Sequence, residues 1–146
     1  MQVENPYAAP KSAVTDSDLQ AINRRIDSLE VSTRWKERFR AIAAAGGPSM
    51  KDFKTLPKEQ CKRVSNFNVL AFLFGPFYYL TKGMWKKAIL YTALMMVIIV
   101  LLSIILDLIG YPRIADSLHF GAAAIYAVRA NIDFYKKLVL GDNGWW

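Results

Sequence analysis

The longest uninterrupted run of hydrophobic positions extends from Ala88 to Leu106, and it contains no charge, no Pro and no Gly. As a helix this run is about 28 Å long, close to the ~30 Å hydrocarbon core of a bilayer. Its Leu, Ile and Val side chains favour membrane insertion by on the order of 5 kcal/mol. A helix in a soluble core is rarely apolar on every face, and a chain this short could hardly cover one. The pattern therefore predicts a transmembrane helix over 88–109.

A second uncharged stretch precedes this helix and a third follows it. The stretch from Val64 to Thr81 is interrupted at Gly75-Pro76, and a proline in mid-helix removes a hydrogen bond and bends the axis. We expect 64–81 to be bent or re-entrant, with a short complete span as the alternative. After a turn at Gly110-Tyr111-Pro112, the weaker third stretch predicts a second transmembrane helix over 114–132. Together these elements form a membrane domain over 64–140.

Amphipathic patterns precede the membrane domain and predict a cytoplasmic helical region over 15–63. Its first helix carries apolar residues at helical spacing, and its second helix, around RWKERF, carries an aromatic face formed by Trp35 and Phe39. That second helix packs on its neighbour in the interpretation we favour; the alternative is a basic helix lying on the membrane surface. Residues 1–14 are expected to be a disordered tail, and 141–146 a C-terminal tail.

Charge predicts which side of the membrane each segment faces. The net charge is +7, and the Lys and Arg residues flank the apolar stretches. If 64–81 turns back, then the basic residues of 51–63, the loop from Lys82 to Lys87 and the pair Lys136 and Lys137 all face the cytoplasm. Only Arg113 remains outside, which agrees with the positive-inside rule. We therefore predict a multi-pass protein with a cytoplasmic N-terminus.

Composition narrows the function classes. The chain is 53% hydrophobic, and its positive charge is not spread over the sequence as in a basic nucleic-acid-binding protein, so no nucleic-acid partner is expected. Cys61 is the single cysteine, which excludes an intrachain disulfide and a cysteine metal cluster. The first residues lack the basic and apolar regions of a secretory signal peptide.

Residues with catalytic or metal-binding patterns are missing from the sequence. His119 is the single histidine and has no cysteine or acidic cluster nearby. No nucleophile–base pair and no phosphate-binding loop is recognisable. We therefore expect no catalytic residue, no cofactor and no metal, and we do not expect an enzyme.

Polar residues at the edge of the membrane domain are the candidate site. Arg129, Asn131 and Asp133 end the third apolar stretch, where the helix is expected to leave the membrane. An amide in an apolar setting needs partners, so the cluster is expected to tie this helix to the loop near Trp85 or to Asn66 and Asn68. A ligand site is the alternative. The full candidate set is Asn66, Asn68, Gly75, Pro76, Trp85, Arg129 and Asn131.

Two segments carry a resemblance to a known family. FNVLAFLFGPFYYLTKGMWKKAI and the later AVRANIDFYKK resemble a family of small bacterial inner-membrane proteins of unknown function. Upstream, RWKERF, a Gly pair, FKTL and Gln60 are similar to the soluble lead-in of some members. The resemblance covers about 31–140, and IDFY departs from the doubled tyrosine of the family ending. It implies an integral protein of a Gram-negative inner membrane, and it carries over no catalytic residue, cofactor or substrate.

These patterns favour an all-α membrane protein in which a two-helix transmembrane hairpin packs against a Gly-Pro-bent segment and short cytoplasmic helices precede both. Its expected role is a membrane-embedded interaction or regulatory module that contacts the lipid bilayer and a protein partner or a second copy. The alternative is a homo-oligomeric pore, a holin-like protein or a transport-accessory subunit. A pore needs a polar stripe, and the main span offers only Thr92 and Ser103.

Overall fold

The computed structural model describes residues 16–64, 67–115 and 117–145. Within these ranges every regular element is a helix and no strand occurs, which confirms the all-α class. In chain order the α-helices and the short 3₁₀ helices (η) are α1 (Asp16–Ser28), α2 (Thr33–Ala44), η1 (Gly47–Ser49), η2 (Phe53–Thr55), α3 (Lys58–Val64), α4 (Val69–Phe74), α5 (Pro76–Thr81), α6 (Trp85–Leu108), α7 (Pro112–Ala115) and α8 (Leu118–Val139). The expected N-terminal tail at 1–14 lies outside the described residues.

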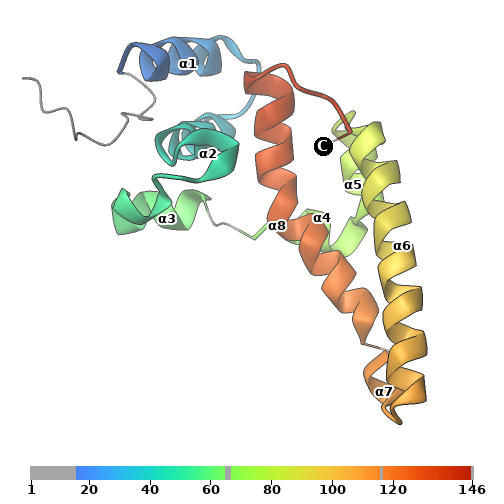
Figure 1. Cartoon of the computed structure of the whole chain (residues 1–146). Coiled ribbons are helices and arrows are strands. Elements are labelled where there is room, and N and C mark those ends of the chain that lie inside the picture. The colour runs from blue at the N-terminus through green and yellow to red at the C-terminus, as the bar shows by residue number, and fades with distance from the viewer. Residues whose placement is uncertain (1–15, 65–66, 116, 146) are drawn as a thin grey trace, which may run out of the picture.

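Helices α1, α2 and α3 lie on one side of α8, whereas α5 and α6 lie on its other side (Figure 1). Ile26 of α1 is completely buried, and so are Phe39 and Ile42 of α2. The rings of Trp35 and Phe39 pack against Phe134 in the C-terminal half of α8, with centroid distances of 4.8 and 5.8 Å. The aromatic face of α2 therefore packs against α8, with Phe39 buried and Trp35 partly exposed.

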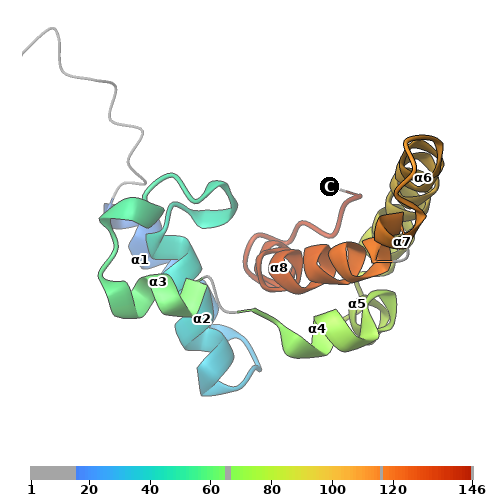
Figure 2. The same ribbon diagram turned by 90° about the horizontal axis from the view of Figure 1, so that it is seen from below.

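The chain bends at Gly75, between α4 and α5. Gly75 has φ 46° and ψ −120°, a backbone conformation that residues with a Cβ rarely adopt. Pro76 begins α5, where its missing N–H leaves no helical hydrogen bond unmade. As a result α4 lies along α8 and α5 lies along α6, instead of one helix continuing through both (Figure 2).

Helices α6 and α8 extend beyond the N-terminal helices as an antiparallel pair, joined at the far end by α7 (Figure 1). In the described part of the chain, α6 is the one helix that is long and apolar enough to cross a membrane, and 11% of its apolar window is buried. Helix α8 does not meet the same criterion, since charged residues such as Arg129 and Asp133 occupy its second half. The second span predicted over 114–132 is therefore not confirmed.

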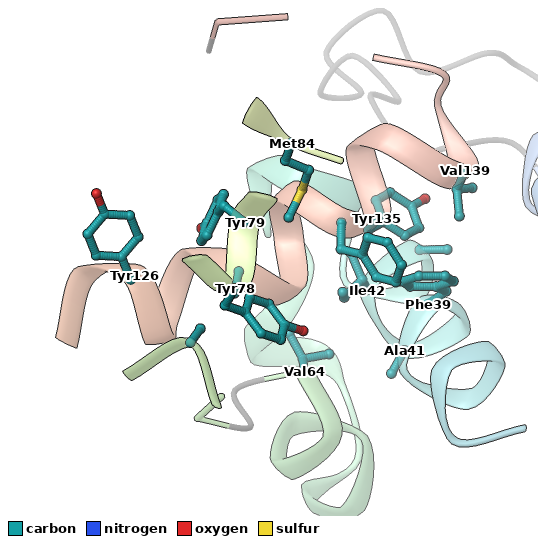
Figure 3. Packing of buried hydrophobic residues seen from close by; sticks show 14 of the residues in the cluster. Phe39, Ala41, Ile42, Val64, Tyr78, Tyr79, Met84, Tyr126, Tyr135 and Val139 are labelled. Carbon is teal, nitrogen blue, oxygen red and sulfur yellow. The ribbon is translucent and has the colours of Figure 1, made fainter. Parts of the chain in front are cut away.

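Helices α4 to α8 expose many large apolar side chains, while a few polar and charged side chains are buried among the apolar residues between them. Between the helices lie Lys87 and Asp133, which are 1% and 0% exposed, together with several tyrosines. Figure 3 shows the buried side chains continuing from Phe39 and its neighbours to Tyr79 and Tyr126. The outward-facing positions are large and apolar, including Leu73, Phe77, Val97 and Leu108, which are 66%, 70%, 57% and 81% exposed.

Candidate functional site

The carboxylate of Asp133 is the centre of a buried polar cluster. Tyr79 and Tyr91 each donate a hydroxyl hydrogen bond to its Oδ2 at 3.0 Å. Lys87 donates from Nζ to Oδ1 at 3.2 Å, and Nη2 of Arg129 lies 3.6 Å from the same oxygen. We call these five residues the Asp133 cluster. Both carboxylate oxygens are thus occupied by donors from the protein itself.

Helical spacing explains how three helices build the Asp133 cluster. Lys87 and Tyr91 are four residues apart on α6 and lie on the same face of that helix. Arg129 and Asp133 have the same spacing on α8. Tyr79 comes from α5, which the bend at Gly75 places alongside α6. The bend at Gly75 and the spacing on α6 and α8 together place these side chains around the Asp133 carboxylate.

The charges of the Asp133 cluster are desolvated to different degrees. Lys87 and Asp133 are fully buried, while the Arg129 side chain remains 42% exposed. Taking both members of an ion pair out of water carries a large desolvation penalty, so such a pair contributes little net stability, yet removing one partner is strongly destabilising. The arrangement therefore selects one way of packing α5, α6 and α8.

Asn131 forms a second polar cluster on another face of α8. Asn68 donates from Nδ2 to Asn131 Oδ1 at 3.1 Å and to the Tyr78 hydroxyl at 3.0 Å. Arg38 of α2 also donates to Asn131 Oδ1, at 3.2 Å. We call these four residues the Asn131 cluster. Asn68 additionally caps α4 by accepting a hydrogen bond from the Ala71 N–H at 3.1 Å, so this cluster connects α2, α4, α5 and α8.

Arg38 is a partly desolvated cation. Burial lowers the pKa of its guanidinium from the usual value. The guanidinium carbon lies 4.8 Å from the ring centroid of Trp35, and its hydrogen-bond acceptor is the neutral Asn131 amide. A positive charge that is partly removed from water favours a nearby anion.

The structure brings only some of the predicted site residues together. Asn68 and Asn131 are in direct contact, and Arg129 reaches Asp133. Gly75 and Pro76 shape the bend and contribute no functional side chain, although a Cβ at Gly75 would contact the Tyr126 ring at 3.7 Å. Trp85 lies apart from both clusters and packs on Trp145 at 5.9 Å between centroids. Asn66 lies outside the described residues.

Sequence reasoning did not identify several members of the two clusters. It assigned Lys87 to an exposed basic loop, which is wrong, because Lys87 lies in the first turns of α6 and is buried. It also overlooked Tyr79, Tyr91 and Arg38. The available signal was the four-residue spacing of Lys87 and Tyr91 in an otherwise apolar helix, which is a polar stripe facing a partner.

The two clusters join helices through hydrogen bonds and ion pairs. In the parts of the chain that the structure covers, no group of three or more His, Cys, Asp or Glu residues is placed to hold a metal ion. His119 lies at the other end of α8, where its ring packs on Phe120 at 4.1 Å. The Asp133 carboxylate is saturated by its own donors, so it is placed to hold helices together.

Known proteins of one family are similar to this chain. The family described as "Protein of unknown function (DUF2628)" matches residues 24–139. The "Uncharacterized protein YigF" of Salmonella typhimurium is 32% identical over 128 residues, which is 82% of this chain and 94% of the relative. The protein of the same name from Escherichia coli K12 is 32% identical over 123 residues, covering 79% and 90% of the two chains. No solved structure is a significant match.

Proposed function

The chain belongs to the DUF2628 family, whose description assigns no activity, and from that premise we propose that it is an integral protein of the bacterial inner membrane. In this proposal it acts as a membrane-embedded interaction or regulatory module. It has no enzymatic activity, and its surroundings are the lipid bilayer and a protein partner or a second copy of the chain.

The large exposed apolar surface of α4 to α8 supports this proposal. An apolar helix with 11% of its window buried exposes its Leu, Ile and Val side chains to the surroundings. Large apolar surfaces of this kind are rare on monomeric soluble proteins, and in lipid they need no cover. The buried interior of tyrosines, Asn131, Lys87 and Asp133 fits the same setting, since polar groups within a bilayer face other helices and pair with one another.

The proposed topology follows from the helix arrangement and the charges. Helices α6 and α8 form the transmembrane hairpin, with α7 on the outer side. Helices α4 and α5 form the bent segment at the cytoplasmic face, and the basic N-terminal helices remain in the cytoplasm. Burial of Lys87 removes one of the loop charges but leaves Lys82 and Lys86 on this side.

A homo-oligomeric pore is the alternative function, and the contacts of the polar residues on α6 weigh against it. Thr92 and Tyr126 share a hydrogen bond of 2.8 Å, and Tyr91 donates to Asp133. These groups are satisfied within one chain and do not form a stripe that could line a water-filled channel. Ser103 alone would be a weak lining for such a channel.

Cysteine labelling in cells tests the proposal. Lys86→Cys and Arg113→Cys are introduced separately into a Cys61→Ser background, and cells with a permeable outer membrane receive a membrane-impermeant maleimide. We expect labelling of Arg113→Cys alone, and retention of the unlabelled parent protein in membranes washed with alkaline carbonate. Labelling at Lys86→Cys only would reverse the topology, and release of the protein by carbonate would overturn membrane integration.

A further inference from the structure

A pocket of about 260 Å³ lies between the N-terminal half of α2 and the start of α4. Its cationic wall is formed by Arg34 and Arg38, which are four residues apart on α2 and therefore share a face of that helix. In the described ranges neither arginine forms an ion pair with a carboxylate. Among the described residues, the pocket thus presents two positive charges with no carboxylate paired to either.

The opposite wall of the pocket is apolar and exposed. It is formed by Phe67, Val69 and Leu70, which are 44%, 58% and 56% exposed. These side chains continue the outward apolar surface of α4, which includes Leu73 at 66% exposure. A free inorganic anion gains nothing from contact with these apolar side chains, whereas a lipid acyl chain is stabilised by such contact.

The pocket lies at the level where the apolar part of α8 ends. The Asn68 backbone N–H donates to the Ala127 carbonyl at 3.3 Å, and Arg38 donates to Asn131 one turn later. In the proposed topology this level is the boundary between the hydrocarbon core and the cytoplasmic head groups. Trp35, which lines the pocket, belongs to the residue types enriched at that depth.

We propose that this pocket binds the phosphate of an anionic phospholipid of the inner leaflet, with an acyl chain of that lipid against Phe67, Val69 and Leu70. Guanidinium groups present a planar fork of donors that matches phosphate oxygens. Arg34 supplies an exposed fork at the mouth of the pocket, and Arg38 supplies a second one deeper inside. The first turn of α2 contains no acidic residue that would repel the phosphate. The inference rests on the proposed membrane location and adds the chemistry of the bound lipid.

Lipid titration of the full-length protein tests the inference. Protein purified in a neutral detergent and stripped of lipid is titrated with short-chain phosphatidylglycerol, with short-chain phosphatidylcholine and with inorganic phosphate. We expect phosphatidylglycerol to bind most tightly. Arg34→Gln should weaken that binding about tenfold, because a charged hydrogen bond contributes roughly one such factor. Arg34 is exposed and makes no ion pair in the described chain, so this substitution should leave the fold intact.

Arg24→Gln is the matched control, since Arg24 is an exposed arginine on α1 outside the pocket. Arg24→Gln should change phosphatidylglycerol binding less than twofold, because a single exposed charge contributes little to the binding free energy. Three outcomes would overturn the inference. Both variants could weaken phosphatidylglycerol binding equally, Arg34→Gln could leave that binding unchanged, or inorganic phosphate could bind as tightly as the lipid. A carbonate wash of the membranes from which the protein is purified is a separate readout. If the protein stays in the membrane but shows no lipid selectivity, only the lipid site is refuted. If the wash releases the protein, the proposed location is refuted.

Discussion

At the scale of single residues, the feature that distinguishes this chain is a carboxylate without access to water. Asp133 is held by two tyrosine hydroxyls and Lys87, with Arg129 nearby. Each of these donors belongs to a helix that also carries exposed apolar side chains. The polar contacts therefore determine which helix faces meet, because apolar packing in lipid distinguishes weakly between alternative faces.

Replacing only Lys87 of the Lys87–Asp133 ion pair should destabilise the protein more than replacing both residues. We expect Lys87→Met to destabilise the detergent-solubilised protein by about 3 to 5 kcal/mol, since it leaves the Asp133 carboxylate buried beside fewer cations. The double variant Lys87→Met, Asp133→Leu should recover most of that loss. Thermal or denaturant unfolding measures both, and Lys86→Met, which removes the charge of a half-buried neighbour outside the Asp133 cluster, is the control. A double variant that is less stable than Lys87→Met would contradict this expectation and would show that the Tyr79 and Tyr91 hydroxyls need the Asp133 carboxylate as their acceptor.

Only part of the two clusters was predictable from the sequence. Asn68 and Asn131 could be matched, because amides in apolar stretches demand partners and the bend leaves them at similar depth. Lys87 was missed, because a basic residue at the edge of an apolar run has the same appearance in a loop and in the first turn of a helix, and only its four-residue spacing from Tyr91 pointed to a shared helix face. Arg38 was also hidden, since its partner lies 93 positions away and no local pattern connects them.

At the scale of elements, the position of the bend decides which helices can meet. Gly75 ends α4 and Pro76 starts α5, so one short segment contacts α8 through its first half and α6 through its second half. The sequence predicted a bend at this dipeptide. It could not predict the direction of the bend, which depends on the hydrogen bonds from Asn68 and Tyr79 to the distant helix α8.

The two residues of the bend should differ in their effect on stability. Gly75→Ala should destabilise the protein by about 1 to 3 kcal/mol, because the backbone at this position suits a residue without Cβ. Pro76→Ala should change stability by much less, since alanine is compatible with the first position of a helix and no hydrogen bond is lost. Denaturant midpoints of the two purified variants make the comparison. A larger loss for Pro76→Ala would mean that proline, and not glycine, holds the bend.

At the scale of the whole molecule, polar contacts lie inside and apolar side chains lie outside over α4 to α8, while α1 to α3 carry charged residues on their exposed faces. The sequence predicted the division between a basic N-terminal part and an apolar part, since both differ in composition. It predicted a weaker apolar stretch ending at Arg129, Asn131 and Asp133, but not that the second half of α8 contacts α2 about as extensively as α8 contacts α6.

A charge at the middle of α6 separates the proposed membrane setting from an aqueous one. Val97 is 57% exposed, so Val97→Lys would be harmless in water. In a bilayer, lysine at the centre of a helix is unfavourable by about 3 kcal/mol, so we expect a clear fall in the amount of protein that resists carbonate extraction. Gln20→Lys, on the exposed face of α1, should leave this amount unchanged. Equal extraction resistance for both variants would contradict a lipid-facing α6.

The ion pair between Lys87 and Asp133 has a consequence for biogenesis. In the proposed membrane setting, Lys87 precedes Asp133 by 46 residues, so α6 reaches the bilayer before α8 has left the ribosome to supply the counter-charge. During that interval the lysine keeps its hydration by reaching toward the cytoplasmic surface. Arrival of α8 replaces water by the carboxylate and locks the hairpin. A truncated chain that ends before Asp133 would retain an unpaired lysine at the membrane edge, which gives quality-control proteases a chemical mark for an unfinished protein.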